Sequence, residues 1–155
     1  MNSELCTFRQ NIFIKMAKEK IIYNSARITG ILLLGASLLH ATLGTAQVMT
    51  AIKLGDVRSD MADTFRIIWI YSTIMLVLTA CWAFFIAGEL RQLRRKAWWQ
   101  GLLIGLGYSG GSLACMAIVG VQPHLVAFTL IGLFMLVPLI RWAGHFKRAN
   151  IKSTF

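Results

Sequence analysis

Charged side chains are scarce in this chain. They make up 14% of its 155 residues, whereas hydrophobic residues make up 57%. Soluble domains carry about 25% charged residues. So few charges leave too little polar surface to cover a water-facing globule, and the composition therefore excludes an ordinary soluble domain.

Acidic residues are scarcer still. Six Asp and Glu stand against sixteen Lys and Arg, which gives a net charge of +10. The basic residues lie in short blocks beside apolar runs, which is where membrane topology signals are found. Because no soluble domain is available to present a basic face, we expect no nucleic-acid binding.

Cysteines are few and isolated, at Cys6, Cys81 and Cys115. They form no CxxC pair and show no metal-ligand spacing, so the sequence predicts neither a redox dithiol nor a metal site. A haem held between two histidines needs both at one depth, and His40 and His124 are predicted at different depths. We therefore expect this chain to hold no metal and no cofactor by itself.

Four long apolar runs dominate the chain, at about residues 28–52, 65–90, 98–121 and 125–142. The first contains no Asp, Glu, Lys or Arg, and as a helix it is long enough to cross a bilayer core of about 30 Å. The sequence thus predicts an all-α integral membrane protein. Its membrane domain, residues 28–142, is expected to form a four-transmembrane-helix antiparallel bundle.

Basic segments flank this membrane domain on both sides. The N-terminal segment 1–27 carries apolar residues at helical spacing, which permits a helix lying on an anionic membrane surface. A partly ordered tail is the alternative for this segment. A basic tail, residues 143–155, ends the chain.

The distribution of basic residues predicts the orientation. Lys and Arg number five in the N-terminal segment, four in the central hairpin and four around the C-terminal tail. The opposite side holds three, balanced by three Asp. The positive-inside rule therefore predicts cytoplasmic N- and C-termini, and we expect the protein in a bacterial inner (cytoplasmic) membrane.

Small residues follow one face of several runs, as expected where membrane helices pack closely. In the first run the line comprises Gly30, Leu33, Ser37, His40, Gly44, Gln47 and Ala51. In the second it comprises Thr73, Leu76, Ala80, Ala83 and Ala87. The third run has two GxxxG-type helix-packing pairs, Gly101 with Gly105 and Gly107 with Gly111.

Polar side chains from three runs are predicted near the membrane midplane. By helical rise His40 lies about 18 Å deep, Thr79 and Tyr108 about 15–17 Å, and Ser112 about 20 Å. An ionisable residue at such a depth raises the hypothesis of a proton or ion path. The alternative is a neutral His40 that bonds to Tyr108 or Thr79 and holds the helices in register.

Three further residues are predicted at the outer rim, namely Asp63, Arg66 and His124. Asp63 lies where the second run begins and is placed to pair with Arg66 one turn later. Such boundary charges usually anchor helix ends. No residue of the chain is predicted to be catalytic.

These observations favour a non-enzymatic accessory or assembly subunit, or a homo-oligomeric module that associates through its helix faces. Its partners would be the lipid bilayer and either other membrane subunits or further copies of itself. The alternative is a small transporter or proton-conducting protein that uses His40. A third interpretation is a membrane enzyme or redox subunit whose cofactor comes from a partner.

Overall fold

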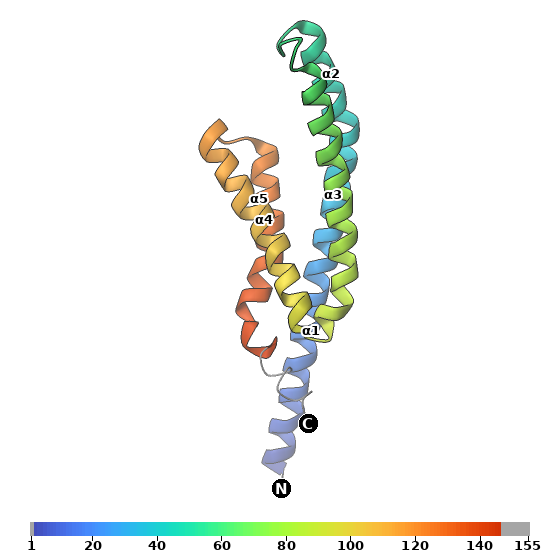
Figure 1. Ribbon diagram of the computed structural model, residues 1–155. Coiled ribbons are helices and arrows are strands. Elements are labelled where there is room, and N and C mark those ends of the chain that lie inside the picture. The colour runs from blue at the N-terminus through green and yellow to red at the C-terminus, as the bar shows by residue number, and fades with distance from the viewer. Residues whose placement is uncertain (1, 147–155) are drawn as a thin grey trace. The chain divides into compact units, whose positions relative to one another are not determined.

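The computed structural model describes residues 2–146, and the side chains of residues 16–146. Over this range the chain is helical and contains no strand (Figure 1). The elements are α1 (Asn2–Leu39), the π-helical turn η1 (His40–Gly44), α2 (Thr45–Leu54), α3 (Ala62–Arg91), α4 (Arg95–Val119) and α5 (Pro123–Arg141). The predicted all-α class is confirmed, and most of the predicted C-terminal tail lies outside the described residues.

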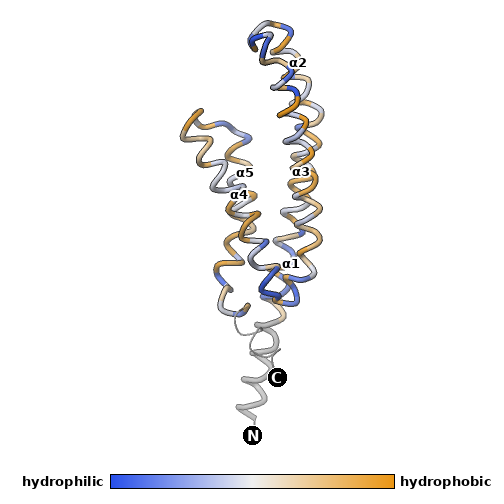
Figure 2. The backbone as a smooth tube through the Cα atoms, in the orientation of Figure 1, coloured by the Kyte–Doolittle hydropathy of each residue, from blue (hydrophilic) through white to orange (hydrophobic). Residues whose placement is uncertain are grey.

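Four of these helical stretches are long and apolar enough to cross a membrane: Met16–Leu54, Ala62–Arg91, Arg95–Val119 and Pro123–Arg141. The last three match the predicted runs to within a few residues at each end, whereas the first begins twelve residues before the predicted start at residue 28. Figure 2 shows the hydrophobic residues along the helices and the hydrophilic ones at the connections. The helices therefore indicate an integral membrane protein.

The N-terminal segment is helical and continuous with the first span. α1 passes from Asn2 through residues 27 and 28 to Leu39 without a break. No proline or glycine occurs before Gly30, so nothing in this stretch interrupts the helical backbone.

The helix ends follow from local sequence signals. Gly55 ends α2 in the left-handed conformation, with φ of 83°. The Gly55 and Asp56 amides donate back to the carbonyls of Ile52 and Ala51, which is a glycine-type helix stop. At the start of the last span, Pro123 occupies the first position of α5, where its missing N–H costs nothing.

The described chain divides into two compact units. The first comprises the described residues up to residue 29 and from residue 83 onward, and the second comprises Gly30–Trp82. α1 and α3 each contribute one part to each unit.

In the first unit, the core joins residues from four helices. Its buried side chains are Ile22 and Ala26 of α1, Ala83, Ile86, Ala87 and Leu90 of α3, Ala97 and Ile104 of α4, Met135 and Leu139 of α5, and Phe146. α4 and α5 form the hairpin seen in Figure 1. Its closest approach uses Gly105 and Gly132, because a Cβ on Gly132 would fall on the backbone of Gly105 and Ser109.

In the second unit, α3 runs back beside η1 and α2 (Figure 1). The predicted face of the second run is largely confirmed, because Leu76 and Ala80 are buried in this unit and Ala83 and Ala87 are buried in the first. The predicted line of the first run holds only in part. Leu33 and Ser37 are buried, but Gln47 is exposed and its neighbour Val48 is buried instead.

Candidate functional site

The candidate site lies in the second unit, where α1 gives way to η1. A π turn closes its hydrogen bonds over five residues instead of four, so it adds one residue to the helical repeat. This extra residue turns the following helix about its axis, which explains why Val48 replaces Gln47 on the buried face. Such turns are frequent at functional positions.

Serine and threonine side chains bond to the carbonyls around this turn. The Ser37 hydroxyl donates to the Leu34 carbonyl at 2.7 Å, and the Thr42 hydroxyl donates to the Leu38 carbonyl at 2.8 Å. The Thr45 hydroxyl reaches the His40 carbonyl at 3.3 Å. In a membrane these bonds matter because water does not satisfy carbonyls that leave the regular helical ladder.

The His40 imidazole lies flat on the Trp69 indole of α3. The ring centroids are 3.7 Å apart and the planes differ by 10°. Stacked rings at this distance attract each other, and an indole face also favours a cation over it. Trp69 thus holds the imidazole in one orientation and is a suitable neighbour for its charged form.

A hydrogen bond to Thr73 fixes the rotation of the imidazole within the plane of its ring. His40 Nδ1 lies 2.7 Å from Thr73 Oγ1, and the Thr73 hydroxyl lies 3.0 Å from the Trp69 carbonyl. A hydroxyl has one proton, so when Thr73 donates to the carbonyl, its oxygen accepts a hydrogen bond from His40 Nδ1–H. The neutral ring then carries its proton on Nδ1.

The indole closes a network between the two helical segments. Trp69 Nε1–H donates to Thr45 Oγ1 at 3.2 Å, and Thr45 Oγ1 donates in turn to the His40 carbonyl. His40 is therefore held through its ring by Thr73 and Trp69 and through its backbone by Thr45. We call these four residues, with Gly44, the imidazole–indole site.

Gly44 makes room for the indole. A Cβ at this position would overlap Trp69 Cζ2 and lie 3.2 Å from Cη2. The glycine on the predicted small-residue line thus serves a specific contact, the approach of an aromatic ring to the helix backbone.

The predicted midplane cluster is distributed over both units. His40 and Thr79 belong to the second unit, where His40 bonds to Thr73 and the Thr79 hydroxyl donates to the Met75 carbonyl at 2.7 Å. Tyr108 and Ser112 belong to the first unit, where the Tyr108 ring lies 5.8 Å from that of Phe128 and Ser112 is buried. The meeting of all four side chains stays a prediction.

The glycine pairs of α4 have different surroundings. A Cβ on Gly101 would meet Leu139 and Met135 of α5, and one on Gly105 would meet Leu136 and the Gly132 carbonyl. Gly107 and Gly111 have no such neighbour within 4 Å. One pair is therefore used inside the first unit, and the other faces outward from it.

The predicted outer-rim residues lie at helix starts. Arg66 donates to Asp63 at 3.0 Å, so the predicted pair is confirmed, and both side chains are exposed. His124 is exposed in the first turn of α5. Among the described residues, no group of three or more His, Cys, Asp and Glu is arranged to hold a metal ion.

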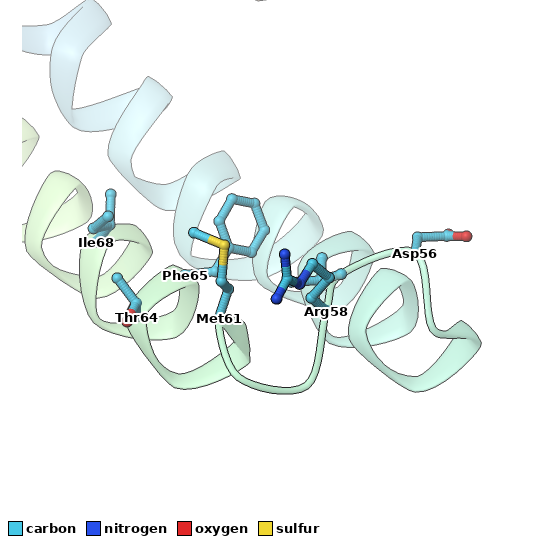
Figure 3. Close-up of a pocket in the computed structure, with 7 residues that line it drawn as sticks. Asp56, Arg58, Met61, Thr64, Phe65 and Ile68 are labelled. Atoms are coloured by element: carbon cyan, nitrogen blue, oxygen red, sulfur yellow. The ribbon is translucent and has the colours of Figure 1, made fainter.

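A hollow of about 310 Å³ lies beside the connection between α2 and α3 (Figure 3). Its lining includes Met61, Phe65 and Ile68, with Arg58 from the connection. The Arg58 guanidinium pairs with Asp60 at 2.9 Å. The hollow therefore combines an apolar wall with two charged side chains, Asp56 and Arg58, of which Arg58 is paired with Asp60.

Trp69 and Thr45 were not predicted from the sequence. Trp69 lies one helical turn before Thr73, so it continues the small-residue face of the second run by one step. That continuation was the available signal. This signal was missed because a tryptophan is not expected on a face of small residues. It fits there only because Gly44 lies opposite and leaves room for the indole.

No protein-family model, curated protein sequence or solved structure matches this chain.

Proposed function

We propose that this protein is a non-enzymatic membrane subunit that associates with other membrane helices through one face of α4. The observation that carries the proposal is the difference between the two glycine pairs. Gly101 and Gly105 already pack against α5. Gly107 and Gly111 lie on the other side of α4, where a Cβ would have no atom within 4 Å. Small residues on an open face allow a partner helix to approach closely.

Large apolar side chains border this glycine face. Leu103 and Ile118, one turn before Gly107 and about two turns after Gly111, are 63% and 83% exposed. A shallow centre between bulky ends is a shape that a second helix fills well, because its side chains pack over the glycines and between the larger residues. The partner is either another membrane subunit or a second copy of the chain.

The proposed setting is a bacterial inner membrane with both termini in the cytoplasm. It is supported by the excess of Lys and Arg at the N-terminal segment, the α3–α4 connection and the C-terminal tail. The lipid bilayer is then the surrounding partner for the exposed apolar faces.

The experiment compares Gly107→Leu with Gly88→Leu in protein purified in mild detergent. Gly88 of α3 is also exposed, and a Cβ added to it would have no atom within 4 Å, so it controls for adding a leucine to an open helix face. We expect Gly107→Leu to abolish co-purification or oligomer formation while the melting temperature of the isolated chain is unchanged. Equal elution of both variants and the wild type would remove the α4 face as an association surface.

A second candidate function is proton or ion conduction through His40. The stack on Trp69 and the π turn favour it, because both set a titratable ring inside a membrane span. Proton flux into liposomes containing the wild type, and its loss in both His40→Gln and His40→Leu, is the expected result for this candidate. Neither replacement titrates between pH 5 and 8, so a conducting His40→Gln protein would refute it.

A further inference from the structure

α1 and α5 border an open groove in the first unit. Its volume is about 580 Å³, and its lining includes the polar Asn24 and Ser25 of α1 beside six apolar residues: Ile21 and Ile28 from α1, and Leu130, Leu133, Phe134 and Val137 from α5. All six side chains are large, apolar and exposed. The groove is therefore suited to a flexible hydrocarbon occupant.

A cationic contact lies at one end of this groove. Lys18 precedes Ile21 by three residues and Ser25 by seven, so it continues the groove face of α1 by one helical turn. Its Nζ lies 3.2 Å from His145 Nε2, which follows the end of α5. The two helices that form the groove are thus joined at this end by a pair of basic side chains.

The lysine keeps donors for an anion. An ammonium has three N–H groups, and since it has no acceptor, it donates one of them to His145 Nε2. The ion pairs between described residues are Arg58–Asp60, Arg66–Asp63 and Arg94–Glu89, so none of them involves Lys18. Its charge is therefore not neutralised by a carboxylate of the described chain.

Arg27 and Arg91 of this unit point to a different face. The guanidinium groups of Arg27 and Arg91 lie 5.5 Å and 5.7 Å from the centre of the Tyr23 ring. Tyr23 and Arg27 are roughly opposite Lys18 and Ser25 around α1, as the 100° step of the helix requires. The Lys18 ammonium is thus separate from these two guanidinium groups.

We propose that the groove binds one anionic phospholipid, with an acyl chain along the apolar walls and the phosphate on the Lys18 ammonium. An amphiphile is the occupant that matches both parts, because a soluble anion uses only the lysine and a neutral lipid uses only the walls. Basic pockets beside membrane helices bind acidic head groups in this manner. His145 is a positioning residue that holds the ammonium at the groove end.

The test measures the melting temperature of detergent-purified protein as phosphatidylglycerol is titrated in, with phosphatidylcholine of the same acyl chains as the reference. We expect a saturable stabilisation by phosphatidylglycerol and a weaker effect of phosphatidylcholine. Lys18→Gln should weaken the phosphatidylglycerol midpoint roughly fivefold, as expected for one basic residue near an anionic lipid. Lys20→Gln, which removes an exposed charge two residues away, should leave the midpoint unchanged.

A second pair of variants tests the groove itself. Val137→Trp fills it, whereas Ile140→Trp adds the same ring on α5 outside the groove, and the two wild-type side chains are similarly exposed at 58% and 60%. Val137→Trp should weaken lipid binding and Ile140→Trp should not. Equal midpoints for Lys18→Gln and Lys20→Gln, equal effects of the two tryptophans, or the same stabilisation from inorganic phosphate would each overturn the proposal.

Discussion

Replacing Gly44 by alanine is the sharpest perturbation of the imidazole–indole site. The added methyl group would overlap Trp69 Cζ2, so the indole has to move. Displacing it weakens the stack on His40 and the bond from Trp69 Nε1–H to Thr45 Oγ1. The change therefore tests whether these contacts stabilise the second unit.

The magnitude follows from the contacts that are lost. An aromatic pair is worth about 0.5–1.5 kcal/mol. A hydrogen bond between membrane helices averages about 0.6 kcal/mol and reaches about 1.7. Gly44→Ala should therefore lower the free energy of unfolding by roughly 1–3 kcal/mol, before the gain in helix propensity of up to about 1 kcal/mol is counted.

Gly35→Ala is the matched control, because it makes the same substitution in the preceding helix where no atom lies within 4 Å of the new Cβ. The propensity gain is common to both variants, so the difference between them isolates the clash with the indole. Unfolding in detergent, monitored by near-UV circular dichroism, measures both stability and the ordering of the aromatic rings. Trp69→Phe removes the atoms that clash, and in that background Gly44→Ala should cost less. Equal stability of Gly44→Ala and Gly35→Ala would refute the reasoning.

Four further outcomes are expected. Gly132→Ala should destabilise the α4–α5 hairpin by about 1–3 kcal/mol, since its Cβ would meet backbone atoms; an unchanged melting temperature would contradict the close approach. Trp98→Phe should cost about 1 kcal/mol in thermal unfolding, because it removes the 3.0 Å bond to the Leu139 carbonyl. His40→Leu should lower the free energy of unfolding by about 1–2 kcal/mol and Thr73→Val by less. The double variant should lose less than the sum of the two, because both substitutions remove the same hydrogen bond. Reporter fusions at Arg94 should read cytoplasmic and those at Asp56 external; the reverse pattern would overturn the predicted orientation.

The sequence by itself determined the four apolar helices and, except at the start of the first, their approximate ends. Hydropathy, charge and residues that start or end helices, such as Gly55 and Pro123, act locally. They can therefore be interpreted without knowledge of the tertiary contacts. The buried face of the second run was also predictable, because a helical repeat of small residues reports a packed face wherever its partner lies. The same local rules identified the Asp63–Arg66 pair, whose members are one turn apart.

Tertiary structure decided which contacts those faces make. The two GxxxG-type pairs of α4 look alike in sequence, yet Gly105 receives α5 and Gly107 does not, since the difference depends on which side of the helix a neighbour approaches. The π turn at His40 likewise has no simple signature, and the one residue it adds moves Gln47 out of the buried line and Val48 into it. Trp69 could be recognised as the partner of His40 only when two segments distant in sequence were brought together, because stacking and hydrogen bonding act over a few ångströms in space and leave no period along the chain.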